Sequence, residues 1–171
     1  FMADRRKPRG FMTDLQNLRH FAEVQAAFHP HPGTMPVNAY VALQKSTDLI
    51  LKEGLEATWA RHDRVARVVR TGVRAMGLQL MAAEEAACAN LTVIMADDQF
   101  LPQAYFDFMI EEYGMQVGLG LGEYLTRSVR IGHMGLNANL EAVVPCLVGF
   151  EQFLRRQGHN VPRGASLAGL E

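Results

Sequence analysis

An arginine inside an apolar run constrains this chain more than any other feature of its sequence. Residues 129–135 read VRIGHMG, so Arg130 lies in a strand-like segment that ends at once in a glycine-containing turn. A guanidinium on a largely buried strand costs free energy unless an anion meets it. Its planar fork suits a carboxylate held by two parallel hydrogen bonds. Two interpretations are open from the residues alone: Arg130 binds the carboxylate of a substrate, or it forms a structural salt bridge with a residue such as Glu123.

Composition excludes several classes of protein. The chain has 171 residues, of which 49% are hydrophobic and 20% are charged, as expected for one soluble globular domain or most of one. The net charge of −1 gives no reason to expect nucleic acid as a partner. No apolar run reaches the roughly 20 residues that span a bilayer, so no membrane partner is expected. Cys88 and Cys146 lie far apart without metal-ligand spacing, which indicates a reduced, cytoplasmic protein without a metal site.

The first 36 residues combine a basic loop, a predicted helix over residues 13–28 and a proline-rich segment. Residues 28–36 contain three prolines and a glycine, which exclude both a helix and a central strand. The pattern predicts a rigid, extended loop there. Such a loop is a suitable place to mount a binding group.

From residue 37 onward, helical and strand-like patterns alternate. Helices are predicted from Asn38, as the N-terminal cap, to about residue 53, and over residues 55–76, 102–113 and 137–157; each is followed by a glycine that can end it. Short strands are predicted over residues 78–82, 90–96, 115–118 and 127–132. This order predicts an α+β fold with a short, mainly antiparallel sheet and helices on one face. The small and polar residues after position 158 predict a frayed tail.

Five short motifs, taken together, resemble those of the class V pyridoxal-phosphate-dependent aminotransferases. In chain order they are TMP at 34–36, EGLE at 53–56, WARH at 59–62, AMGL at 75–78 and RIGHMG at 130–135. The likeness is to the alanine–glyoxylate and serine–pyruvate aminotransferases and to their pyridoxamine–pyruvate relatives. It implies the C-terminal portion of a fold-type I enzyme. Residues 1–36 would be the exit segment of the large domain with an interface loop, residues 37–158 a long connecting helix and the small domain, and residues 159–171 the frayed tail.

The resemblance also implies a chemistry. Enzymes of this family move an amino group from a small alanine- or serine-like amino acid to glyoxylate or pyruvate. They hold pyridoxal 5'-phosphate on a Schiff-base lysine in a large domain that precedes this region. The lysines here are Lys7, Lys45 and Lys52, and none has the strand-to-turn setting that this lysine needs. We therefore expect the chain alone to be inactive, and we expect upstream sequence or a partner chain to supply the lysine.

The resemblance assigns roles to four residues. Arg130 matches the arginine that binds the substrate carboxylate. Thr34 matches a position that reaches across a homodimer interface toward the cofactor phosphate, and the backbone N–H of Gly33 can assist it. His31 replaces an aromatic residue of some relatives and is the third expected cofactor contact. The residues alone also allow Thr34 to bond its own backbone and His31 to be simply exposed.

Three other features have structural interpretations. His133 is expected to pack or bond within its turn rather than to titrate in a reaction. The glycine run at residues 118–122 lacks the spacing of a phosphate-binding loop and is interpreted as a flexible segment near the site. Trp59 is interpreted as a core or interface anchor. A different function also stays open, that of a non-catalytic α+β domain that binds a carboxylate or serves in dimerisation.

Overall fold

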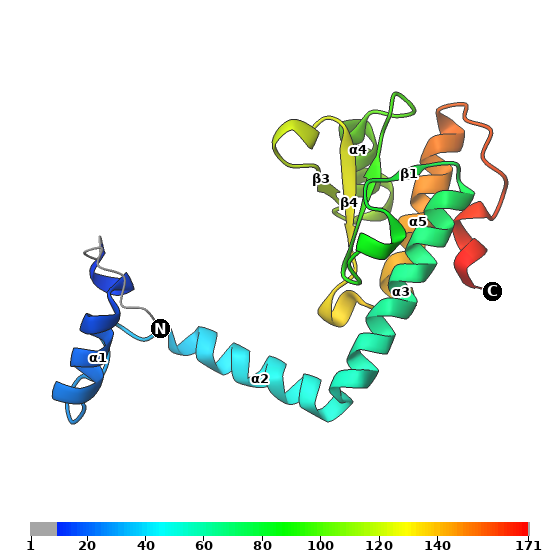
Figure 1. The fold of residues 1–171 in the computed structure, drawn as a ribbon. Coiled ribbons are helices and arrows are strands. Elements are labelled where there is room, and N and C mark those ends of the chain that lie inside the picture. Colours follow the sequence, from blue (N-terminus) through cyan, green and yellow to red (C-terminus); the bar gives the residue numbers. More distant parts are fainter. Residues whose placement is uncertain (1–9, 171) are drawn as a thin grey trace. The chain divides into compact units, whose positions relative to one another are not determined.

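The chain divides into two units, Phe1–Lys52 and Glu53–Glu171. The structure is a computed structural model and describes residues 10–170 (Figure 1). The first unit contains the 3-10 turn η1 (Phe11–Thr13), helix α1 (Leu15–Val24) and nearly all of helix α2 (Val37–Glu53). None of these three elements has a buried residue. The part of the first unit that the structure describes therefore leaves its apolar side chains at least partly exposed.

Local signals explain where the helices of the first unit begin and end. The Asp14 side chain caps α1 by accepting a hydrogen bond from the backbone N–H of Gln16 at 2.9 Å. The helix ends at Val24, earlier than predicted, because residues 25–28 form a turn in which Phe28 N–H donates to the Gln25 carbonyl. The proline-rich segment after it contains no helix or strand, as predicted.

The second unit has an α+β architecture, which confirms the predicted fold class. Its helices are α3 (Leu55–Ala75), α4 (Pro102–Tyr113) and α5 (Leu140–Arg156). Its strands are β1 (Gln79–Leu80), β2 (Leu91–Met95), β3 (Gly118–Leu119) and β4 (Ser128–Gly132). All pairings are antiparallel, and the strand order is β1-β2-β4-β3, so β4 is central and β3 is an edge strand (Figure 1).

The helices cover one face of the sheet. Ile94, Val129 and Ile131 point to that face and are buried, whereas the alternate residues Val93 and Arg130 are half-buried on the other face. The core beneath the sheet is formed largely by aromatic and aliphatic side chains of the three helices. The arrangement leaves Arg130 on the face of the sheet that the helices do not cover.

The end of the chain differs from the frayed tail expected from the sequence. Residues Ala165–Leu170 form the 3-10 segment η5, which packs on α3 and α5. The Glu151 carboxylate accepts hydrogen bonds from the Gly164 N–H at 2.9 Å and from the Ser166 N–H and hydroxyl at 3.0 and 2.5 Å. Gly72 of α3 permits this packing, because a Cβ there would collide with the Ser166 carbonyl.

The glycine run also differs from expectation. Its first two residues are strand β3, and Gly120 is buried. A Cβ on Gly120 would collide with the Tyr124 carbonyl and the Ser128 hydroxyl, so the chain turns tightly here. The run is therefore a closely packed strand and turn rather than a loose segment. Across residues 10–170, no helix combines the length and the apolar character needed to cross a membrane.

Candidate functional site

Arg130 lies at the centre of β4, between strands on both sides. The register places it opposite Val93 of β2 and Gly118 of β3. Leu91 and Met95 lie two residues before and two residues after Val93, so they share the same face and are half-buried like Arg130. The guanidinium therefore extends from a mostly apolar surface, where an attraction to an anion is screened less than in open water.

The contacts of Arg130 leave part of its guanidinium available. Its Nε–H donates to the Leu119 carbonyl at 2.7 Å. Among residues 10–170, neither Nη1 nor Nη2 makes a hydrogen bond, and no carboxylate forms an ion pair with this arginine. The alternative salt bridge to Glu123 is thus absent from the described structure; Glu123 is exposed in η3 (Gly122–Tyr124). Two terminal nitrogens can therefore receive an external anion.

A clamp from α3 holds the turn that follows β4. Arg61 Nη1 donates to the carbonyls of Gly135 and Ala138, each at 2.9 Å. Glu53 binds the same guanidinium at Nε and Nη2, at 2.5 and 2.8 Å. These hydrogen bonds from Arg61 lower the pKa of Glu53 to about 2. Arg61 is thus a structural group that joins the start of α3 to the end of the Arg130 strand.

His62 also connects α3 to the turn after β4. Its Nδ1 lies 2.7 Å from the Thr58 carbonyl, and its Nε2 lies 3.1 Å from the backbone nitrogen of Gly135. A carbonyl can only accept and a backbone N–H can only donate. In neutral His62, these contacts place the proton on Nδ1.

His133 is enclosed on the covered side of the sheet and is fully buried. Its Nε2 lies 2.8 Å from the Thr92 hydroxyl, and its Nδ1 lies 3.2 Å from the Ala89 carbonyl. Burial lowers the pKa of His133 below its ordinary value of 6.5. Its partners lie in and before β2, so it fastens two neighbouring strands rather than bonding within its own turn.

We expect the second unit to lose stability between pH 7.5 and 5.5 because of His133. Its pKa is lower in the folded than in the unfolded state, so the unfolded state binds the proton first as the pH falls below 6.5. Stability therefore falls with decreasing pH in this window. Glu53 and Glu84 are among the carboxylates whose pKa is lowered. These groups affect stability only when the pH approaches their ordinary pKa of 4.5.

The measurement is urea denaturation of the chain at several pH values. The His133→Gln variant should lose most of the dependence between pH 5.5 and 7.5, whereas His159→Gln, at a half-buried position in the same unit, should keep it. An unchanged slope in the His133 variant would contradict this assignment.

The three predicted cofactor contacts lie in one loop of the first unit. Thr34 is exposed, and neither its hydroxyl nor the backbone N–H groups of residues 33–35 bond to another described residue. These groups are donors that fit a phosphate. The His31 Nδ1 lies 2.7 Å from the Gly33 carbonyl, so in neutral His31 the proton is on Nδ1 and Nε2 can only accept. His31 can therefore donate to a phosphate from Nε2 only as an imidazolium.

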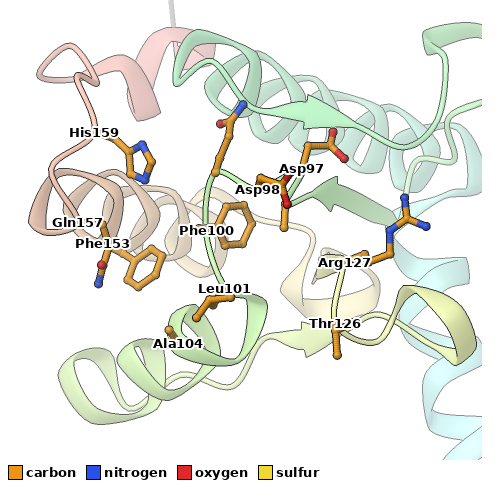
Figure 2. A pocket seen from close by; sticks show the side chains of 12 residues that line it. Asp97, Asp98, Phe100, Leu101, Ala104, Thr126, Arg127, Phe153, Gln157 and His159 are labelled. Carbon is orange, nitrogen blue, oxygen red and sulfur yellow. The ribbon is translucent and has the colours of Figure 1, made fainter.

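The second unit also contains a cavity of about 510 Å³, which the sequence did not indicate (Figure 2). It is lined by the turn between β2 and α4, the start of β4 and the end of α5. Asp97 and Asp98 adopt left-handed φ values of 37° and 63°, and Gln99 N–H closes their turn on the Ala96 carbonyl. None of the predicted site residues lines this cavity, and its acidic pair is explained by the turn.

Trp59 does not lie in the core, which was one of its two expected positions. It is 60% exposed and lines a groove with Met134 and His62. The interpretation as a core residue was therefore wrong.

Comparisons with known proteins agree on one family. No family model matches the chain. The chain is 33% identical to a pyridoxamine–pyruvate transaminase of Mesorhizobium japonicum, over 81% of the chain and 35% of the relative. It is 32% identical to a serine–glyoxylate aminotransferase of Arabidopsis thaliana, over 80% of the chain and 34% of that relative. The chain thus spans about a third of the length of these curated relatives.

Solved structures give the same result. The crystal structure of pyridoxamine–pyruvate aminotransferase from Mesorhizobium loti matches with a TM-score of 0.78 and 32% identity, over 84% of this chain and 37% of that one. An alanine–glyoxylate aminotransferase from Nostoc sp. matches with a TM-score of 0.77 and 29% identity, over 90% and 40% of the two chains. The chain belongs to the class V aminotransferase family and corresponds to the C-terminal domain of its members.

Proposed function

We propose that this chain is the C-terminal part of a pyridoxal-phosphate-dependent aminotransferase, and that Arg130 binds the carboxylate of its substrates. The amino group would pass from a small, alanine- or serine-like amino acid to glyoxylate or pyruvate. The names of the relatives support this substrate class: two of them pair serine or alanine with glyoxylate, and a third names pyruvate as the acceptor. The observation that carries the proposal is the Arg130 guanidinium, anchored through Nε with both terminal nitrogens available.

Arg130 contributes by binding and orienting the substrate. Both the amino donor and the 2-oxo acid carry a carboxylate next to the reacting carbon. A two-point grip on that group fixes the direction of the bonds at this carbon, which is worth several kcal/mol in a well-oriented reaction. Pyridoxal 5'-phosphate is the cofactor expected for this family and, when bound, supplies the electron sink for the reaction.

The loop around Thr34 is proposed to bind the phosphate of the cofactor. The Thr34 hydroxyl and the backbone N–H of Gly33 are donors without a partner among the described residues, which supports this role. His31 joins them as a donor in its imidazolium form. In a homodimer this loop would serve the cofactor of the neighbouring subunit.

The lysine that carries the cofactor is proposed to lie outside this chain. Lys45 and Lys52 are exposed on α2, and Lys7 lies outside the described residues. Preceding sequence of the same polypeptide or a partner chain would supply that lysine. Residues 1–171 alone would then be inactive.

The test of the proposed function compares two amino donors with the intact enzyme. We expect alanine to be a donor and alaninamide, which lacks the carboxylate, to have a kcat/KM lower by about 100-fold or more. Hydrogen bonds to charged groups contribute about 1.5–3 kcal/mol each, and the amide loses the charge that Arg130 binds. Steady-state assays with glyoxylate and with pyruvate as acceptors measure both donors.

Two outcomes would contradict parts of the proposal. Equal use of alanine and alaninamide would show that Arg130 does not bind the substrate carboxylate. Failure of the intact protein to transfer an amino group from any small amino acid would favour the non-catalytic α+β domain instead.

A further inference from the structure

We propose that Gly118 and the Leu119 carbonyl position Arg130 so that it binds a substrate carboxylate end-on, through Nη1 and Nη2. This inference rests on the proposed function and adds two positioning residues and a binding mode to it. Both residues belong to the edge strand β3, beside the arginine.

Gly118 provides the space in which the Arg130 side chain lies. The two residues are register partners on neighbouring strands. A Cβ built on Gly118 would lie 3.3 Å from both Cβ and Nε of Arg130 and 3.4 Å from its Nη2. The arginine side chain therefore runs across β3 directly over this glycine. A Cβ at residue 118 would therefore require the Arg130 side chain to shift by a few tenths of an ångström.

The Leu119 carbonyl provides the anchor at the far side of β3. In an antiparallel pair, successive residues alternate between facing the partner strand and facing away from it. Gly120 N–H donates to the Ser128 carbonyl at 2.9 Å, so the preceding residue, Leu119, turns its carbonyl toward the free edge of the sheet. Arg130 Nε–H reaches this carbonyl at 2.7 Å. The bond satisfies an edge acceptor that would otherwise face solvent.

This anchor selects one of the two ways in which a guanidinium can hold a carboxylate. The side-on mode uses Nε and one terminal nitrogen, and the end-on mode uses the two terminal nitrogens. Because Nε–H already donates to the Leu119 carbonyl, the side-on mode is not available to a carboxylate. The end-on pair stays available, and the direction of the Nε–H bond sets where that pair points.

The kinetic test uses the intact enzyme and a matched pair of glycine substitutions. Gly118→Ala places a methyl group against the guanidinium. Gly132→Ala, on the same face of β4, adds a methyl group where no atom lies within 4 Å. Neither glycine has a left-handed φ, so the backbone accepts alanine at both positions. Only the first substitution should disturb Arg130.

We expect Gly118→Ala to lower kcat/KM for alanine about tenfold, mainly through KM, and to leave kcat/KM for alaninamide unchanged. Alaninamide has no carboxylate for Arg130 to bind, so displacement of the guanidinium should not change kcat/KM for this donor. Gly132→Ala should stay within about twofold of the parent enzyme for both donors. The ratio of the two donors separates positioning of Arg130 from a general structural defect, which would lower both values together.

Three results would overturn the inference. The first is an equal loss for both donors in Gly118→Ala, and the second is a Gly118 variant that behaves like the Gly132 variant. The third is a crystal structure of the intact enzyme with a bound carboxylate in which an oxygen lies on Nε instead of Nη1 and Nη2. If Arg130→Gln also leaves the donor ratio unchanged, the proposed function itself fails. If Arg130→Gln changes the ratio and Gly118→Ala does not, only the present inference fails.

Discussion

The Arg130→Lys variant of the intact enzyme is expected to lose about 10- to 100-fold in kcat/KM for its amino donor. Lysine keeps the positive charge but replaces a planar fork with a single ammonium group, so one of the two parallel hydrogen bonds is lost. A hydrogen bond to a charged group contributes about 1.5–3 kcal/mol, which corresponds to this range of rates. Arg130→Gln removes the charge as well and should lose more. Steady-state kinetics with alanine measures both variants.

Arg127→Lys is the matched control for Arg130→Lys. Arg127 immediately precedes β4, is exposed and lies over the Tyr124 ring with its guanidinium carbon 5.8 Å from the ring centre. The same change of side chain there should leave the kinetics within about twofold. A normal KM in the Arg130→Lys enzyme would show that the fork does not hold the substrate.

The Phe150→Ala variant is expected to lower the free energy of unfolding of the second unit by about 3–5 kcal/mol. Phe150 is fully buried on α5. Its ring stacks on Tyr105 of α4 with centroids 4.0 Å apart and meets the Phe100 ring edge to face at 5.1 Å. Truncation leaves a cavity between α4 and α5 and removes both aromatic contacts. Urea denaturation followed by circular dichroism measures the change.

Leu136→Ala is the control for this stability measurement. Leu136 lies in the same unit, in the 3-10 turn η4 (Gly135–Asn137), and is 82% exposed. Its removal should change the free energy of unfolding by less than about 0.5 kcal/mol. Similar losses in both variants would mean that the helices do not form the core described above.

The elements that the sequence predicted well are those with local end signals. Helix α3 lies between Gly54 and Gly77, and α4 begins at Pro102 and ends before Gly114, whose φ of 61° is the left-handed cap expected of a glycine. The prediction of a frayed tail was wrong because the order of this segment depends on contacts with residues that are distant in sequence. Ser166 packs on Gly72 and bonds Glu151, and no periodic pattern in residues 159–170 records these partners.

The site shows the same limit. Arg130 could be found from its own segment, because a charge in an apolar strand is visible in the sequence. The Leu119 carbonyl could not, since every residue carries a carbonyl and only the folded structure shows which one the guanidinium reaches. The role of Arg61 could not be found either, because this arginine binds carbonyls of the turn after β4. Its role depends on a turn 74 residues away in sequence.

The attachment of β4 at both of its ends has a thermodynamic consequence for ligand binding. At the start of the strand, the Ser128 hydroxyl donates to the Tyr124 carbonyl at 3.2 Å. After it, His133 N–H donates to the Asn90 carbonyl at 2.9 Å, and Gly135 is held by His62. A carboxylate that binds Arg130 as proposed would therefore meet a strand that is already held at both ends, and this strand would lose little conformational entropy when the complex forms.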